Sequence, residues 1–427
     1  MRDHCSPLDI ARGDRTQYVA SFGDDVSIEQ VQAVSEDTTA RRYRICRTGT
    51  FYWKLPEAKG SAKLPQMAPG KKQELVNQIC QALERDSRVI SVQKPTIEPD
   101  YSQRKTIYPD WARTSSDDLL TGADRFQVLK LSGPILFHVH VPRKNQPLFH
   151  GNDDIPTEDY FVSWDGVTAF VLWGQDDDVV VPLSGGHIVS EILSVALATM
   201  TAELYIQACS PECDNQFFHT AMVIRLQSGA SQDRFDLKLQ PLRRGKVEVP
   251  VPSDMDNFEV LEWMHLHLGL DSDRFAEVKN LARRVIDIES SARDELAHLL
   301  GHYYEHASVA AQPLWRTLKK RWRMREWRRE ARQILAGLWL SLANLETLRR
   351  DWEDSRRNFE ASGAESMLLF EIDYSDDTTS VQSLEVSHFD ATVEQISHNL
   401  DYRAVVMATV GGALAGGLAG ALVGLIH

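Results

Sequence analysis

The chain has 427 residues, of which 43% are hydrophobic and 25% charged. That is an ordinary balance for a globular protein with two or three cores, and it argues against large-scale disorder. The net charge of −14 argues against a general nucleic-acid-binding protein. Five cysteines, an odd number, favour free thiols in a reducing compartment over a disulfide framework. The N-terminal residues contain no apolar stretch, so we expect no secretory signal and a cytoplasmic location for the bulk of the chain.

The first 130 residues alternate strand-like runs with one helix. Residues 41–46 resemble a strand, and 88–94 resemble another. Between them, 71–86 places Leu75, Ile79, Cys80 and Leu83 on one face of a helix. Residues 95–124 are rich in turn-forming side chains and predict a surface loop.

The strand signal is densest between 126 and 250, where short apolar runs are separated by Gly, Pro and Asp. One interruption, 187–208, has the length and alanine content of a mostly buried helix. This order predicts a mixed sheet with helices packed on it, which is an α/β or α+β fold. We therefore expect residues 1–250 to form a cytoplasmic sensing or binding domain.

Residues 251–360 show helical periodicity and predict a helical domain or connector, in which Pro313 opens the last helix. Within 361–402, SMLLFEIDY (366–374) predicts a short strand. A juxtamembrane helix is expected to begin near residue 381 and to run into the tail at 403–427.

The tail, AVVMATVGGALAGGLAGALVGLIH (404–427), differs from everything before it. Its first 23 positions carry no charged side chain. As a helix they would span about 34 Å, against a hydrocarbon core of about 30 Å. Small residues recur at every fourth position: Ala404, Ala408, Gly412, Gly416, Gly420 and Gly424. Such a groove lets helix backbones approach closely in lipid, so the pattern predicts a glycine-zipper transmembrane helix that packs against copies of itself.

A flexible or core-buried hydrophobic terminus is the alternative interpretation of the tail. The Gly and Ala content makes the segment only moderately hydrophobic, so insertion of a single copy would be marginal and packing with other copies would stabilise it. Arg403 at the near edge favours an anchor with residues 1–400 on the cytoplasmic side.

A basic, Trp-rich stretch occupies 313–332, with nine Lys or Arg and two Glu. It suits an anionic membrane surface. Docking on an acidic surface of the chain itself or of a neighbouring subunit is an equal alternative, and nucleic-acid contact is a weaker one. The residues concerned are Trp315, Arg316, Lys319, Lys320, Arg321, Trp322, Arg323, Arg325, Trp327, Arg328 and Arg329.

His298, His302 and His306 step by four along one predicted helix, after Asp294. Neighbours at this spacing lie about 5–6 Å apart at Cβ, so a pair could hold a metal ion, although all three could not easily share one. Glu295 and His298, like Glu385 and His388, also show the Glu-x-x-His spacing of di-iron helix bundles. A polar helix stripe is the simpler interpretation, and no other cofactor is indicated.

Two further His pairs are more simply structural. His138 and His140 would point to the same face of a strand, whereas His265 and His267 would diverge on a helix.

Ser184, Gly185 and Gly186 follow a strand-like run and open a helix, where free backbone N–H groups could bind an anion. No P-loop lysine, GxGxxG or hydrolase motif accompanies them. The sequence therefore supports no enzyme activity, and no catalytic residue is assigned.

The order of an α/β domain, a helical region and a C-terminal span resembles that of CorA-type ion channels. The resemblance implies a cytoplasmic α/β domain, a long stalk helix and C-terminal membrane helices. It covers layout only, because the Gly-Met-Asn signature and second span of those channels are missing from this sequence.

The sequence favours a membrane effector whose cytoplasmic domain senses a small-molecule or protein trigger and whose glycine-zipper helices permeabilise the bilayer. Bacterial systems that kill or arrest a cell through its membrane have a similar layout. Its expected partners are the lipid bilayer and other copies of the chain. The alternative is a membrane-tethered enzyme or binding module that uses its last helix only as an anchor.

Overall fold

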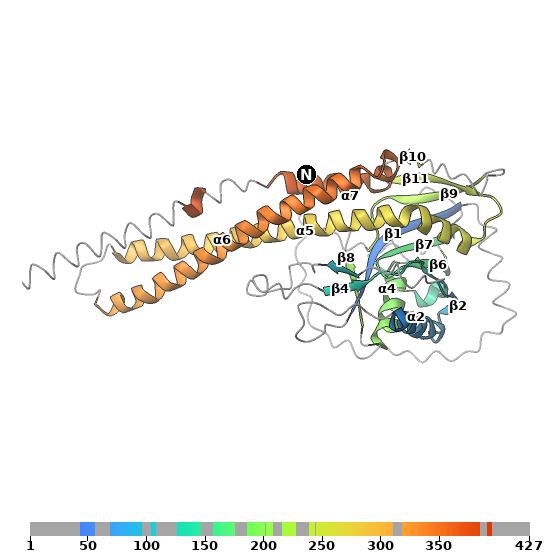
Figure 1. Cartoon of the computed structure of the whole chain (residues 1–427), viewed down its shortest axis with the longest axis horizontal. Helices are drawn as coiled ribbons and strands as arrows, with labels where there is room; N and C mark the ends of the chain where they lie inside the picture. Colours follow the sequence, from blue (N-terminus) through green and yellow to red (C-terminus); the bar gives the residue numbers. More distant parts are fainter. Residues whose placement is uncertain are drawn as a thin grey trace, which may run out of the picture. The chain divides into compact units, whose positions relative to one another are not determined.

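The computed structural model (Figure 1) describes the central part of the chain. The described residues are 43–55, 69–95, 104–107, 126–146, 157–175, 186–200, 202–207, 216–227, 239–243, 245–310, 318–384 and 391–394, and within 302–328 the description covers the backbone alone.

A mixed sheet forms the middle of the fold, with the strand order β10-β11-β9-β1-β7-β6-β5-β2, while β4 and β8 pair with β1 and β3 with β4. All its pairs are antiparallel except β9 with β11. The strands are β1 (Tyr43–Lys54), β2 (Val89–Gln93), β3 (Arg104–Ile107), β4 (Phe126–Leu129), β5 (Ile135–His140), β6 (Asp159–Trp164), β7 (Thr168–Gln175), β8 (Glu203–Gln207), β9 (Ala221–Gln227), β10 (Gln240–Arg243) and β11 (Lys246–Pro252).

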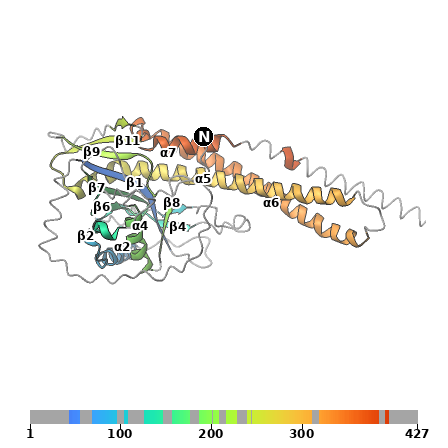
Figure 2. The same cartoon turned by 180° about the vertical axis from the view of Figure 1, so that it is seen from behind.

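Helices cover both faces of this sheet (Figures 1 and 2). They are α2 (Pro69–Glu84), α4 (Gly186–Ala198), α5 (Asn257–Ala310), α6 (Leu318–Glu360) and α7 (Ala364–Gln382), with a short 3-10 helix, η2 (Arg143–Asn145). Because side chains alternate along a strand, one core forms on each face. In β7, Val171 and Trp173 pack with α2 and α4, whereas Phe170 and Leu172 pack with α5, α6 and α7. The expected mixed α/β fold is confirmed.

The longest helix, α5, contains 54 residues and begins with a reciprocal cap. Asp256 accepts the Glu259 N–H at 2.8 Å, and Glu259 accepts the Asp256 N–H at 2.8 Å. Such a capping box satisfies two free backbone donors and fixes where the helix begins.

Helices α5 and α6 form an antiparallel pair. Phe275 packs on Phe359 near the sheet, while Glu295 faces Gly337 farther along. The residues expected to form a helical domain or connector therefore begin on the sheet itself, because Val260, Leu261 and Met264 of α5 share a core with β7 and β9.

Three sequence-based expectations were wrong. The segment 366–374 is not a strand but part of α7: Ser366, Leu369, Phe370 and Asp373 are buried at helical spacing. Residues 187–208 are not one helix, because α4 ends at Ala198 and β8 begins at Glu203. The loop expected over 95–124 contains β3, which pairs with β4. In each case contacts between distant parts of the chain, rather than the local sequence pattern, decided the secondary structure.

Within the described part of the chain, no helix has both the length and the apolar character that crossing a bilayer requires. The glycine-rich segment 404–427 lies outside the described residues. The four residues 391–394 of the expected juxtamembrane helix are helical.

Candidate functional site

A pocket of about 500 Å³ opens between the β4–β5 connection, the β6–β7 turn and the first turns of α5. Its floor contains ionisable side chains and its rim contains apolar ones. The lining residues are Lys130, Leu131, Ser132, Gly133, Pro134, Asp165, Met255, Glu259, Glu262, Trp263, His265, Leu266, Gly269 and Leu270.

Asp165 is held at the floor by a tight Asp-Gly turn between β6 and β7. Its Oδ1 accepts the N–H groups of Val167 and Thr168 at 2.9 and 2.7 Å. Gly166 has φ +89°, and a Cβ there would lie 2.1 Å from the Leu129 carbonyl oxygen. Only glycine fits both the backbone conformation and this approach, so the turn fixes the carboxylate.

His265 reaches the same carboxylate from α5. Its Nε2 lies 3.2 Å from Asp165 Oδ2, and its Nδ1 lies 3.1 Å from Ser163 Oγ. A Cβ on Gly269, one turn later, would come within 3.1 Å of the imidazole. Glycine at this position therefore leaves the ring the space in which it bridges helix and sheet.

Lys130 completes the floor. Its Nζ lies 3.1 Å from Asp273 Oδ2 and 3.7 Å from Asp165 Oδ2. Burial alone would lower the pKa of Lys130, but the two carboxylates outweigh it and the pKa is raised. Lys130 is therefore a cation shared between the sheet and α5.

The same contacts set the charge of Asp165, whose side chain is 1% exposed. Burial pushes its pKa upward, but His265, Lys130 and the Thr168 N–H outweigh that push and lower the pKa to about 2. The carboxylate is therefore ionised at neutral pH, and its negative charge balances that of Lys130.

Serine, histidine and aspartate in contact suggest nucleophilic catalysis, but accessibility argues against it here. Ser163 is fully buried and is not among the lining residues, so its hydroxyl faces no substrate. Its contact with His265 orients the ring and satisfies a buried polar group. The floor can bind and orient a polar group of a ligand.

The rim is open and carries exposed leucines and carboxylates. Leu266 and Leu270 are 74% and 55% exposed and follow Trp263 on the first turns of α5, while Glu259 and Glu262 are exposed on the same turns. Exposed leucines beside a charged floor are typical of a site that binds a molecule with an apolar part and a polar part.

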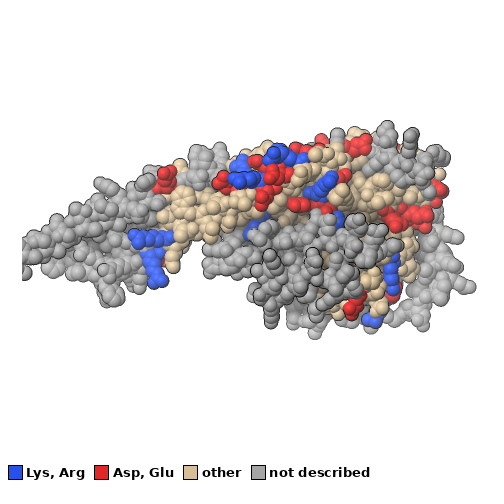
Figure 3. All heavy atoms as spheres, in the orientation of Figure 1, with Lys and Arg blue, Asp and Glu red and all other residues tan. Residues whose placement is uncertain are grey.

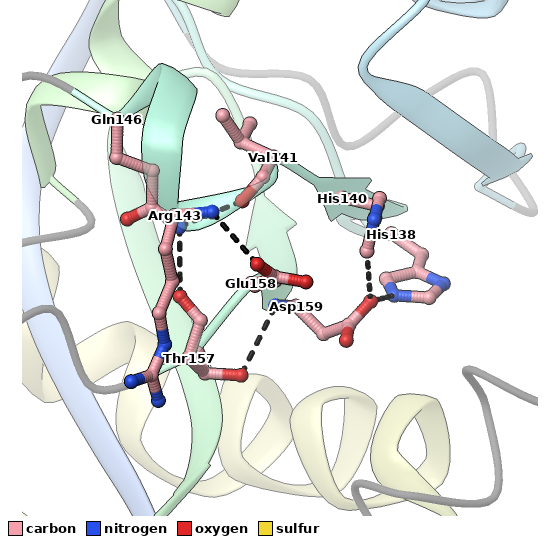
Figure 4. Close-up of polar contacts among 8 residues, drawn as sticks. All are labelled: His138, His140, Val141, Arg143, Gln146, Thr157, Glu158 and Asp159. Carbon is pink, nitrogen blue, oxygen red and sulfur yellow. Dashed lines mark hydrogen bonds and ion pairs between the residues drawn. The ribbon is translucent and has the colours of Figure 1, made fainter.

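A second polar cluster lies on β5 and β6 (Figure 4). The imidazoles of His138 and His140 both contact Asp159 Oδ1, at 2.9 Å from Nε2 and 3.0 Å from Nδ1, respectively. The prediction that the two histidines share a strand face is consistent with this geometry. His138 also stacks on Phe161, with ring centroids 4.3 Å apart.

The contact between Asp159 and His140 shifts the pKa of both side chains. The hydrogen bond to Asp159 raises the pKa of His140, although burial opposes the effect. Burial would raise the pKa of Asp159, but the two histidines outweigh it and lower the pKa. Gln146 closes the neighbouring connection by donating to the Val141 and Thr157 carbonyls at 2.7 and 2.8 Å.

A third network joins α7 to α5 and to the residues before β9. Lys279, which is fully buried, lies 3.1 Å from Asp377 Oδ2 and 4.0 Å from Asp373 Oδ1. Asp373 accepts the backbone N–H and the Nδ1 contact of His219, both at 2.9 Å. Burial raises the pKa of Asp377 more than the nearby cations lower it.

The residues proposed from sequence fall mostly outside these networks. Gly186 begins α4, and a Cβ there would lie 2.8 Å from Phe217, so close packing explains this glycine. Ser184 and Gly185 lie outside the described residues, and the anion site stays a prediction. His265 and His267 do diverge: His265 lies on the pocket floor, while His267 contacts the Trp263 ring.

No group of three or more metal-ligating side chains occurs among the described residues. His298 is exposed on α5, but the side chains of His302 and His306 are not described, so the predicted pair is untested. The basic stretch at 318–328 forms the start of α6, and Trp315 and Arg316 precede the described part of that helix. The zipper residues from Ala404 to Gly424 are likewise outside the description.

Sequence reasoning missed Lys130, Asp165 and Asp273. The Asp-Gly pair between two apolar strands was the one available signal, because it marks a hairpin turn with a polar residue at its start. Nothing local marks Lys130 or Asp273, which meet only through the packing of α5 on the sheet.

Comparison with known proteins gives no relative: neither a protein-family model, nor a curated protein, nor a solved structure matches the chain.

Proposed function

We propose that this chain is a membrane-acting effector: the pocket binds a small-molecule or protein trigger, and the C-terminal glycine-rich helices of several copies associate and permeabilise a bilayer. The observation that carries the proposal is the continuity of α5. Its first turns line the pocket, and the same helix continues for 54 residues to the connection with α6.

A helix of this length spans about 80 Å. Because a helix is stiff over several turns, a displacement of Trp263 or His265 by a ligand would be carried along α5. Asp165 and Lys130 contact α5 and stabilise its position on the sheet when no ligand is bound. A ligand that engages these two side chains would weaken those contacts and favour another position of α5.

The membrane part of the proposal rests on the apolar tail with its fourfold repeat of Gly and Ala. Dye release from lipid vesicles tests it, with the intact chain compared with a Gly416→Leu/Gly420→Leu variant. Leucines would fill the groove and keep the helices apart, so we expect release by the intact chain and little by the variant. Equal release by both would contradict the proposal.

A membrane-tethered enzyme or binding module is the second candidate, favoured by the Lys130, Asp165 and His265 floor of an open pocket. Deleting residues 404–427 separates the two. A tethered module would keep its ligand binding or turnover in solution, whereas an effector would lose vesicle permeabilisation, the only activity it has.

A further inference from the structure

After α6 ends, α7 runs alongside α5, and the residue numbers of the contacting pairs differ by a nearly constant amount. Ser366 donates to Asp271, and the rings of Phe370 and Phe275 stack at 4.4 Å. The residue numbers in both pairs differ by 95. One to two turns later, Asp377 contacts Lys279, where the difference is 98. Helix α7 is therefore parallel to α5 and nearly in step with it.

Val393 shows that this course continues beyond α7. It is fully buried in a cluster with Ala292 and Leu299 of α5 and Leu338 of α6. An offset of 95 would carry Val393 to about position 298 of α5, between those two α5 residues. Residues 391–394 thus lie on the α5–α6 pair, farther from the sheet than α7 and toward the end at which the two helices are connected.

The sequence pattern predicts that the contact face of Val393 continues on both sides of it. Phe389, Val393, Ile396 and Leu400 are spaced by four, three and four residues, the pattern of a helix that packs on others along one stripe. With the offset of 95, Ala404 falls at about position 309 of α5, which ends at Ala310. The glycine-rich segment would then begin where α5 and α6 meet.

That end also contains the basic stretch of the chain. Helix α6 starts at Leu318 with LKKRWRMREWRR, in which seven of twelve residues are Lys or Arg and two are Trp. Arg329, the last residue of this segment, and Arg332 just beyond it are exposed. Figure 3 shows basic side chains at this end of the described helices, with an acidic group near them. Net charge does not explain this, because the chain as a whole is acidic, at −14.

We infer that the tip of the α5–α6 pair, residues 318–332, binds anionic lipid headgroups at the surface where the glycine-rich segment enters the bilayer. The inference rests on the proposed membrane function of residues 404–427. Basic residues near an anionic bilayer attract its headgroups and Trp side chains lie at its interface. The register places both features at the point where a membrane helix would begin.

The first test compares two charge reversals of equal size on α6 in the full chain. Lys319→Glu/Lys320→Glu/Arg321→Glu alters the tip, and Arg349→Glu/Arg350→Glu/Arg357→Glu alters the half near the sheet. Binding is measured to phosphatidylcholine vesicles with and without phosphatidylglycerol. We expect the tip variant to lose at least about tenfold in its preference for anionic vesicles and the control variant to keep it.

Equal losses in the two variants would overturn the inference, because net charge would then explain the binding. A tip variant that keeps its vesicle preference but loses binding to duplex DNA would overturn it in favour of nucleic acid. Dye release by the Gly416→Leu/Gly420→Leu variant is read separately. If that variant loses dye release but keeps its preference for anionic vesicles, the tip assignment stands. If it loses dye release while the two charge variants show equal losses of lipid preference, the tip assignment fails and the zipper stands.

The second test checks the register. A short bis-maleimide should link Val309→Cys to Ala404→Cys in the full chain, identified by the mass of the joined peptides. The matched control is Ala297→Cys with Ala404→Cys, about 18 Å out of register along α5. Linkage of the control pair at the same or a higher yield would overturn the inference.

Discussion

The two faces of the sheet are covered by helical layers of different chemistry. Helices α2 and α4 contribute buried aliphatic side chains, such as Ile79, Leu83 and Ile192, and no buried ionisable group among their described residues apart from the thiol of Cys80. Helices α5 and α7 also bury charges: Asp273, Lys279, Arg283, Arg284, Glu289, Asp373 and Asp377. The interior of one layer is apolar, while that of the other also depends on matched charges.

The difference matters because apolar contacts and buried ion pairs respond differently to pH and to ligands. Apolar burial is non-directional and indifferent to pH, so it fixes a layer without specifying an exact register. A buried ion pair recovers its desolvation cost only with good geometry, and removal of one partner leaves an uncompensated charge. The α5–α7 layer is therefore the one whose position a proton or a ligand can change.

The largest expected effect is on the charged layer. Lys279→Met would remove the cation that lies 3.1 Å from Asp377 and 4.0 Å from Asp373, and we expect a loss of about 4 kcal/mol in the free energy of unfolding at pH 7. Urea denaturation measures it. In Lys279→Met/Asp377→Asn the loss should be smaller, because one of the two carboxylates is then neutral. A single variant within about 1 kcal/mol of the wild type would mean that the network does not anchor α7.

A mutation in the apolar layer should lower the free energy of unfolding almost as much, but this cost should not depend on pH. Ile192→Ala in α4 removes a fully buried side chain, and we expect a cost of about 3 kcal/mol from lost burial and the cavity left behind. The cost should be the same at pH 5 and pH 8. A cost that changed with pH would break the contrast between the two faces.

Asp165→Asn tests the pocket floor. The folded-state pKa of Asp165, about 2, lies below the ordinary value of 3.8, so its stabilisation is present above pH 4 and is lost as the pH falls toward 2. We expect the variant to lose on the order of 2 kcal/mol at pH 7 and the difference from wild type to vanish near pH 2. Denaturation followed across this range measures both.

A surface pair supplies the control for that experiment. Glu203→Gln breaks the Lys54–Glu203 contact, 2.7 Å long, in which the Glu203 side chain is 69% exposed. We expect this variant to lose less than about 1 kcal/mol in the free energy of unfolding, and we expect the loss to change little with pH. If Glu203→Gln were as costly as Asp165→Asn, burial would not be what distinguishes the floor.

The smallest effect should come from His140, at the edge of the charged face. Its pKa is raised above 6.5 by Asp159, so the stabilisation is complete below that value and is lost as the pH rises through the folded pKa. The wild type should therefore lose less than about 1 kcal/mol between pH 6 and pH 8, and His140→Ala should lose less over the same range. Parallel curves for the two proteins would contradict this assignment.

Strands and helices with a clean period were predictable. Strands β5, β6 and β7 and helix α2 follow from short apolar runs and one apolar stripe. The segment at 366–374 misled because MLLF suits either structure, and only Asp373 and Asp377, one turn apart on Lys279, reveal the helix. A local sequence pattern cannot reveal this contact, because its partners are about a hundred residues apart in the chain.

The candidate site was harder to predict than the fold. Lys130 directly follows β4, Asp165 lies in a turn and Asp273 in α5, and they form a floor only after the sheet has formed and α5 has packed on it. Each alone has an ordinary sequence context. The strongest sequence signal, the glycine repeat, lies outside the described residues.

Strand β1 has a consequence for how the protein folds during synthesis. It pairs with β4, β7, β8 and β9, so its partners extend from Val128 to Ile224. A ribosome therefore releases β1 long before the last of these partners exists, and the sheet depends on distant contacts that form slowly. The α5–α6 pair needs only a seven-residue connection between Ala310 and Leu318 and can assemble quickly once translated. Mutations that prolong the exposure of β1 should therefore lower the yield of folded protein even where they leave its final stability unchanged.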